Sequence, residues 1–186
     1  MIRKLRIKFI LVSMFSMLLV LSVILGIVNV LNYDEIVHDA DSVLALLNAH
    51  AGELPVPVQA IDWRSAGDRY KSPELPYESR YFSVFLTQDG TTAAVSTGKI
   101  AAADTQAAIE YAQMVLNSGD SRGFVENYRY ILYLSGDEIH IIFLDCRREI
   151  GAFQNFLLTS TGVGLLGLFS VLLLLIILSG RIVKPF

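Results

Sequence analysis

Two long stretches without any charged residue limit what this chain can fold into. The first runs from Phe9 to Tyr33 and the second from Ile150 to Gly180. An apolar helix needs roughly 20 residues to cross the hydrocarbon core of a bilayer, so each stretch is long enough to span one. A chain of 186 residues leaves little sequence to cover the second stretch as a buried core helix. We therefore predict transmembrane helices at 9–33 and 150–180.

The charged residues are distributed unequally around these stretches. The segment 34–149 holds all 18 acidic residues and 9 of the 15 basic ones, a net charge of −9. The outer tails, 1–8 and 181–186, carry only basic charges, namely Arg3, Lys4, Arg6, Lys8, Arg181 and Lys184. Lys and Arg concentrate on the cytoplasmic side of membrane spans. This pattern predicts a two-pass cell-membrane protein with a cytoplasmic basic tail, an extracytoplasmic segment 34–149, and a cytoplasmic juxtamembrane linker beginning at 181.

A cleaved signal peptide is the alternative explanation of the first stretch. The apolar part of a signal peptide usually has about 7–15 residues and ends at small residues suited to cleavage. Here the apolar run is longer and ends as Asn29-Val30-Leu31-Asn32-Tyr33, without an Ala-x-Ala site. We therefore interpret the first stretch as an uncleaved anchor.

The segment between the spans has the length of one small domain. From Asp34 to Ala51 its apolar residues recur at helical spacing, which predicts a stalk helix that continues the first span. Gly52 and Pro55 provide the stop. The apolar stripe of this helix packs either on its own domain or on the same helix of a second copy, and comprises Ile36, Ala40, Val43 and Leu47.

The rest of the segment has the pattern of two strand pairs separated by a helix. Strands are predicted at 80–87 and 91–97 around a turn at 88–90, and at 128–134 and 139–145 around a second turn. Asp104 is a suitable N-cap for a helix that ends near Gly119. This order predicts an α+β fold, in which an antiparallel sheet carries helices on one face.

Several local sequences resemble a group of bacterial sensor histidine kinases: RYFSVFLTQDG, IEYAQMVLNSG, YRYILYLSGDEIHIIFLDC and the exit SGRIVKPF. The two-span arrangement is similar to their sensor half, which contains an extracytoplasmic PAS-like domain called Cache or PDC. The resemblance implies a homodimer that detects an external small molecule or protein and signals to a cytoplasmic kinase and its response regulator. ATP and Mg²⁺ would belong to a kinase domain beyond Phe186, and no cofactor is expected in this segment.

Alternatives to this function remain open at the level of sequence. Related sensors also precede chemoreceptor domains and cyclic-dinucleotide enzymes, and a non-enzymatic membrane interaction subunit is a further alternative. The sequence contains no phosphate-binding Gly loop, no Gly-x-Ser-x-Gly and no clustered metal ligands, so we expect no catalytic residue and no metal site here. We expect no nucleic-acid partner.

The resemblance implies ligand binding, which the sequence does not exclude, because PAS-like sensors hold small molecules against the open sheet face. For each single residue we favour the alternative, in which the tyrosines pack the core and the arginines lie at the surface. The candidate ligand-binding residues lie in or at the ends of strands: Arg80, Tyr128, Arg129, Tyr130 and Asp145. Trp63, Arg64, Arg69 and Tyr70 precede the first strand and are further candidates. Strand alternation directs Arg129 away from both tyrosines, so only one of these two sets can face a pocket unless a bulge intervenes.

Two other features suggest contacts rather than chemistry. Small residues share one face of the second span and predict a close helix–helix contact: Ser160, Gly164, Gly167 and Ser170. Cys146, the only cysteine, precedes Arg147 and Arg148, whose charges would lower the pKa of its thiol. We interpret it instead as a small buried residue at the strand end.

The predicted orientation can be tested by labelling single cysteines in intact cells. A cysteine at Thr91 should react with an impermeant thiol reagent added outside, whereas cysteines at Lys4 or Lys184 should react only after the membrane is opened. Labelling of either tail in intact cells would reverse the orientation.

Overall fold

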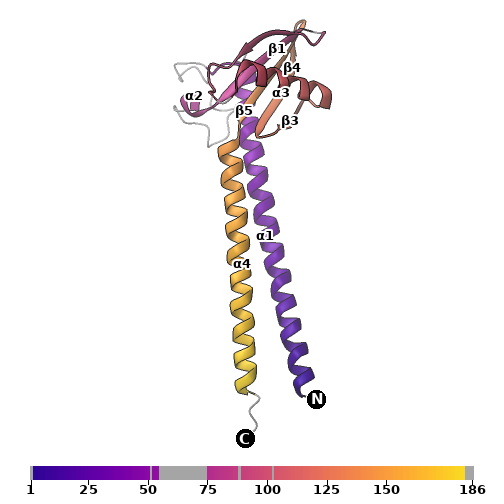
Figure 1. Ribbon diagram of the computed structural model, residues 1–186, viewed down its shortest axis with the longest axis vertical. Helices are drawn as coiled ribbons and strands as arrows, with labels where there is room; N and C mark the ends of the chain where they lie inside the picture. Colours follow the sequence, from indigo (N-terminus) through magenta and orange to yellow (C-terminus); the bar gives the residue numbers. More distant parts are fainter. Residues whose placement is uncertain (1, 51, 55–74, 88, 102, 183–186) are drawn as a thin grey trace. The chain divides into compact units, whose positions relative to one another are not determined.

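The computed structural model describes residues 2–50, 52–54, 75–87, 89–101 and 103–182. Its element order is one long helix, a sheet interrupted by a shorter helix, and a second long helix (Figure 1). The contacts divide the chain into two compact units. We call residues 1–34 with 151–186 the helical unit and residues 35–150 the sheet unit, and describe each by itself.

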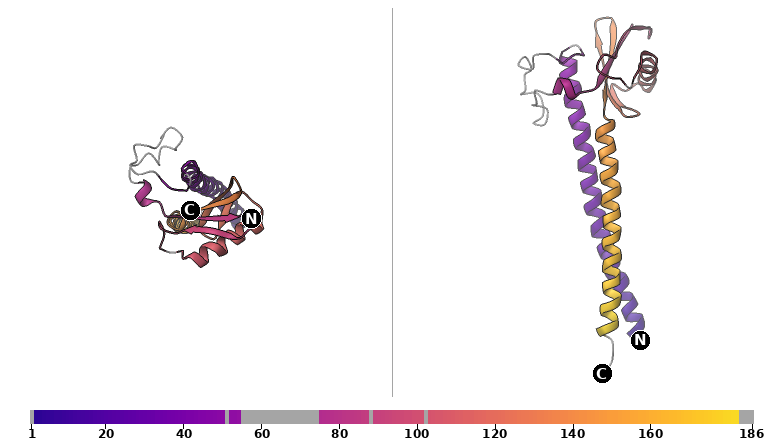
Figure 2. Two further views of the ribbon diagram at one scale, coloured as in Figure 1. Left: turned by 90° about the horizontal axis from the view of Figure 1, so that it is seen from above. Right: turned by 60° about the vertical axis from the view of Figure 1, so that its left-hand side comes forward.

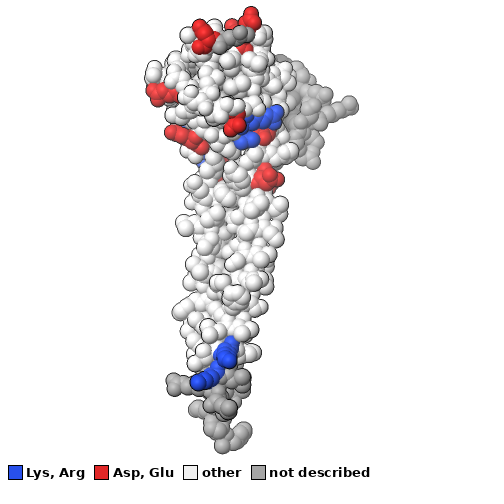
Figure 3. Space-filling model, turned by 90° about the vertical axis from the view of Figure 1, so that its right-hand side faces the viewer, with Lys and Arg blue, Asp and Glu red and all other residues white. Residues whose placement is uncertain are grey.

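The helical unit consists of parts of α1 (Ile2–Ala49) and α4 (Arg147–Ile182). Both helices are long and apolar enough to cross a membrane, with a mean hydropathy of 2.7 in their most apolar windows. Almost none of the side chains in these windows is buried within the protein. Figure 3 shows basic side chains near one end of the two helices. Over most of the remaining length of the helices, the face drawn there carries no charged side chain. Exposed apolar surface of this extent is unfavourable in water and favourable in lipid.

The sheet unit is built on five antiparallel strands in the order β2-β1-β5-β4-β3. Of the strands that the structure describes, the first and the last along the sequence are therefore neighbours, and the last is the central strand. The antiparallel sheet and the α+β class are confirmed, and the four predicted strands lie within two residues of their expected positions. The strands are β1 (Tyr81–Thr87), β2 (Thr92–Ser96), β3 (Arg122–Val125), β4 (Tyr128–Ser135) and β5 (Glu138–Asp145).

Two short elements were not predicted. The edge strand β3 has only four residues and includes Gly123, so its strand pattern is weak. The helix α2 (Leu75–Glu78) is a single turn immediately before β1. Of the two, α2 contributes Tyr77 and Glu78 to the candidate site described below.

The helices cover both faces of the sheet, so the prediction of helices on one face is wrong (Figure 2). The last turns of α1 pack on one face, where Ile142 and Leu144 of β5 point. The helix α3 (Thr105–Ser118) packs on the other face, where Ile141 and Phe143 point. Successive strand residues point to opposite faces, and in β5 both sets are apolar. A strand of this kind can be buried on both sides.

The helix α3 begins and ends at the residues that the sequence indicates. The carboxylate of Asp104 accepts a hydrogen bond from the backbone N–H of Ala107 at 2.8 Å. Gly119 ends the helix with a φ of 74°, a left-handed conformation that costs glycine little. The buried face of the helix consists of Ala108, Ala112 and Val115, whose small side chains allow a close approach to the sheet.

Gly123 should be required by the ring of Tyr130, its neighbour across β3 and β4. A Cβ atom at position 123 would lie 2.8 Å from the Tyr130 hydroxyl, and the buried ring has little space to move. We expect Gly123→Ala to lower the free energy of unfolding by about 1–3 kcal/mol. Urea titration of the full chain in detergent micelles would measure the change.

Gly98→Ala is the matched control for this substitution. A Cβ atom at Gly98 would have no neighbour within 4 Å. The free energy of unfolding should therefore stay the same or rise by up to about 1 kcal/mol. Equal effects of the two substitutions would show that the Tyr130 contact is not limiting.

Candidate functional site

A cavity of about 580 Å³ lies in the sheet unit where β1 begins and β5 ends. We call it the base cavity. Its volume is in the usual range for a small-molecule site, about 300–1,000 Å³. Its apolar part comes from α1 and the end of β5, and consists of Ile36, Ala40, Val43, Leu144 and Cys146. Its polar part comes from α2, the residues before β1, the last residue of β5 and the first turn of α4, and it combines both signs of charge.

Three arginines and three carboxylates line the polar part of the base cavity: Arg80, Arg147, Arg148, Glu78, Asp145 and Glu149. One pair among them is closely bound. The Arg147 guanidinium donates to both carboxylate oxygens of Asp145, at 3.0 and 2.7 Å. The backbone N–H of Arg147 donates to the same carboxylate at 3.0 Å. Asp145 therefore fixes the first residue of α4 through three hydrogen bonds.

The ion pair also determines how these two groups titrate. Burial acts to raise the pKa of Asp145, but the hydrogen bonds from Arg147 outweigh it, and the pKa lies below its ordinary value. The carboxylate raises the pKa of Arg147 in return, chiefly through the side-chain hydrogen bond. Both groups are consequently charged at neutral pH.

Arg147 is held on its other side by an aromatic ring. Its guanidinium carbon lies 5.5 Å from the ring centre of Tyr128, within the range of a cation–π contact. The end of β5 is itself attached to neighbouring segments, because the Asp145 N–H donates to the Arg80 carbonyl and the Cys146 N–H donates to the Asn127 carbonyl, both at 2.9 Å. The junction between the sheet and α4 is thus bonded on several sides.

The structure divides the predicted ligand-binding residues of the strands among three locations: the base cavity, the core under α3, and a contact with α1. Arg80 and Asp145 line the base cavity. Tyr128 and Tyr130 lie in the core under α3, on the opposite side of β4 from Arg129. The directions expected from strand alternation are confirmed. Four other candidates, Trp63, Arg64, Arg69 and Tyr70, lie outside the described residues.

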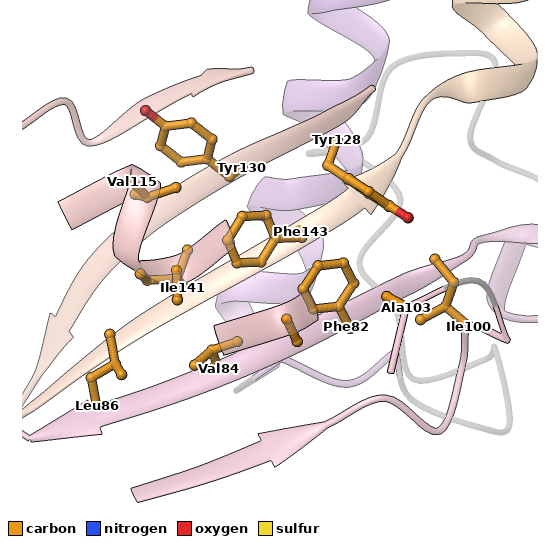
Figure 4. Close-up of a cluster of buried hydrophobic side chains, with 12 residues drawn as sticks. Phe82, Val84, Leu86, Ile100, Ala103, Val115, Tyr128, Tyr130, Ile141 and Phe143 are labelled. Atoms are coloured by element: carbon orange, nitrogen blue, oxygen red, sulfur yellow. The ribbon is translucent and has the colours of Figure 1, made fainter. Parts of the chain in front are cut away.

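Aromatic side chains of the protein itself occupy the sheet face around Tyr128 and Tyr130 (Figure 4). Phe82 and Phe143 stack with ring centres 4.6 Å apart, and Phe82 meets Tyr128 edge to face at 5.3 Å. The Tyr130 hydroxyl lies 3.2 Å from the Ser118 hydroxyl of α3. On this face both tyrosines fill the core, and the Tyr130 hydroxyl bonds to α3.

Arg129 makes a long-range ion pair that the sequence does not reveal. Its Nε and Nη2 atoms donate to the two carboxylate oxygens of Asp41 on α1, at 2.8 and 3.0 Å. Its guanidinium also lies 4.9 Å from the ring centre of Phe124. The two paired side chains are only 13% and 25% exposed. A bidentate ion pair that is partly shielded from water is stronger than an ordinary surface ion pair. This one attaches α1 to β4.

The predicted stripe on the stalk helix packs on its own domain. Ala40, Val43 and Leu47 are buried against the sheet, and Ile36 lines the base cavity. The sequence allows a second copy of the helix as the alternative partner. Three of the four residues are covered by the same chain, so a contact between copies would require another face of α1.

Cys146 is buried at the end of β5, with an exposed fraction of 2%. Burial raises the pKa of its thiol to about 11, despite the hydrogen bond that its sulfur makes with the main chain of Arg129. The thiolate is the reactive form of cysteine, and at neutral pH it is scarce here. The residue therefore has the structural role that we inferred from the sequence.

In the helical unit, Gly164 lies against α1. A Cβ atom at this position would be 3.2 Å from Leu21 and 3.4 Å from Leu25, whereas one at Gly167 would meet no atom within 4 Å. Ser160 and Ser170 donate their hydroxyls to main-chain carbonyls of the same helix, those of Leu157 and Leu166. Of the two glycines predicted to form a helix contact, Gly164 is the one whose added Cβ would touch α1.

No family model, curated protein or solved structure matches this chain. Within the described residues, no three His, Cys, Asp or Glu side chains gather closely enough to hold a metal ion. Function is therefore inferred from the base cavity and from the attachments of the two long helices.

Gly164 and Gly162 of α4 should differ in their effect on helix packing. Gly164→Ile adds bulk against Leu21 and Leu25, so it should separate α1 from α4. Gly162 does not line the hollow beside α1, and a Cβ atom there would meet no atom within 4 Å, so Gly162→Ile should leave the packing unchanged. A cysteine pair at Tyr33 and Phe153, whose rings are 5.8 Å apart, can report this by its rate of disulfide formation. Gly164→Ile should slow the reaction at least fivefold, and equal rates in the two variants would contradict a close contact of Gly164 with α1.

Proposed function

We propose that this chain is the signal-input module of a bacterial transmembrane sensor histidine kinase. In this function the sheet unit is an extracytoplasmic PAS-like domain, and α1 and α4 are membrane spans. A stimulus outside the membrane changes the sheet unit, and α4 transmits the change to a cytoplasmic kinase domain. The local sequence resemblance, the α+β fold and the two long apolar helices support this proposal.

The observation that carries the proposal is the direct connection between the central strand and an apolar helix. Only Cys146 separates β5 from α4, and Asp145 at the end of the strand binds both the backbone and the side chain of Arg147. The strand is paired on both edges, with β1 and with β4. A change at this end of the sheet therefore acts on α4 without a flexible linker between them.

The sheet unit also holds α1. The Arg129–Asp41 pair and the buried stripe of α1 fix this helix to the face of the sheet opposite α3. The unit thus contacts both helices that lead into the proposed spans. A ligand with different affinities for two arrangements of these helices would shift the population between them, by no more than the difference in binding free energy.

We further propose that the module acts as a homodimer and signals to a response regulator through the kinase. In the sheet unit the face of α1 that the sheet leaves exposed includes His38, Ala45 and Ala49. If this face joins two copies, a cysteine at Ala45 should form a disulfide between copies. A cysteine at the buried Val43 should not. Equal crosslinking at both positions would exclude a specific contact through this face.

A fusion of residues 1–186 to the catalytic core of a sensor kinase would test the function. Each alanine inserted at the junction rotates the helix by about 100°, so autophosphorylation in membrane vesicles should vary with a helical period. Two inserted residues should change the output most, and four should restore most of it. Asp145→Asn should also change the output by weakening the attachment of α4.

Asp120→Asn is the control for Asp145→Asn, because Asp120 is exposed near the end of α3 and its carboxylate makes no hydrogen bond or ion pair among the described residues. Its output should equal that of the unmodified fusion. A fusion that inserts correctly but responds neither to the inserted residues nor to Asp145→Asn would contradict a signalling role.

A further inference from the structure

We propose that the base cavity binds the zwitterionic head group of a membrane phospholipid, a phosphodiester that carries a primary ammonium group. The inference rests on the proposed function for the membrane location of the chain. The proposed function leaves the ligand open, and this inference names its class. The ligand would be a lipid of the same membrane that the two long helices are proposed to span.

The position of the cavity along the chain is the first reason. Ile36 follows the last residue of the first apolar stretch, Tyr33, by three positions, and Glu149 directly precedes the second stretch. Both residues line the cavity, and each lies within about one helical turn, or about 5 Å, of an apolar stretch. The head-group layer of a bilayer is roughly 5–8 Å thick on each side. Part of the cavity wall is therefore expected at the depth of lipid head groups.

The charges around the cavity are the second reason. Asp145 and Arg147 neutralise each other. Among the residues that the structure describes, the guanidinium groups of Arg80 and Arg148 have no hydrogen-bond or ion-pair partner, and the carboxylates of Glu78 and Glu149 have none either. The cavity thus offers two planar donors suited to a phosphate and two acceptors suited to an ammonium group.

This balance of charge selects among head groups. An anionic lipid without an ammonium group would satisfy the arginines and leave both carboxylates beside its phosphate. A quaternary ammonium group has no N–H to donate to Glu78 or Glu149. A primary ammonium head group satisfies both sets, so it should bind most tightly.

The apolar part of the cavity favours a lipid over a soluble zwitterion. Ile36, Ala40 and Val43 of α1 line the cavity together with Leu144 and Cys146. A soluble zwitterion such as glycerophosphoethanolamine would leave this surface uncovered. The glycerol carbons and first methylene groups of a phospholipid would cover it, and burial of apolar surface of this kind favours binding.

Native mass spectrometry of the full chain in detergent can test the proposal. Titration with phosphatidylethanolamine, phosphatidylglycerol and phosphatidylcholine gives a dissociation constant for each lipid. We expect phosphatidylethanolamine to bind at least tenfold more tightly than the other two. The double substitution Arg80→Gln with Arg148→Gln should weaken its binding at least tenfold, whereas Arg122→Gln, at an exposed arginine on β3, should have no effect.

Each contrary result overturns a specific part of the proposal. Equal binding of the three lipids would exclude head-group recognition, and equal effects of Arg122→Gln and the double substitution would place the binding elsewhere. Binding of glycerophosphoethanolamine as tight as that of the phospholipid would assign the cavity to a soluble ligand.

A second variant keeps the test decisive if the arginine substitutions impair folding. Glu78→Gln with Glu149→Gln retains the arginines, so it should keep phosphatidylglycerol binding and abolish the preference for phosphatidylethanolamine. A preference that persists would overturn the proposal. Failure of the proposed function is seen separately, in the cysteine labelling and in the kinase fusion.

Discussion

The sheet unit depends on the burial of its central strand on both faces. Ile141, Ile142 and Phe143 are fully buried in β5, although they point alternately to opposite sides of the sheet. Each such side chain contributes roughly 1.5–3 kcal/mol when it leaves water. In addition, β1 is hydrogen-bonded to one edge of β5 and β4 to the other. A shift of this strand would therefore disturb two helices and two neighbouring strands. It is also the strand that leads into α4.

This packing determines where polar chemistry can lie. Both faces of the sheet are covered largely by apolar and aromatic side chains, and six charged side chains gather instead where β1 begins and β5 ends, in the base cavity. Arg129, the second residue of β4, is a partly buried charge that lies outside this cavity. A guanidinium in this position would be costly without a partner, and Asp41 of α1 supplies one with matching geometry. The pairing of one partly buried cation thereby links two segments that lie 88 residues apart.

The sequence predicted the elements better than it predicted their contacts. The aromatic and β-branched runs located β1 and β4, and Asp104 and Gly119 located both ends of α3, because these signals act over a few neighbouring residues. The faces of the sheet were assigned wrongly, since a strand that is apolar on both sides does not indicate how many helices cover it. Arg80 and Asp145 were identified because strand ends are recognisable. The base cavity itself was not identified, because its walls come from three segments far apart in sequence.

In the proposed extracytoplasmic location, the burial of Cys146 has a chemical consequence. External thiols are ordinarily exposed to oxidants, to disulfide exchange and to coupling between neighbouring molecules. This sulfur is closed off by the junction that it occupies, and its raised pKa keeps it protonated. Burial and protonation of the thiol therefore disfavour its oxidation and disulfide exchange, so a rearrangement that passes through the strand-to-helix connection is expected to stay noncovalent.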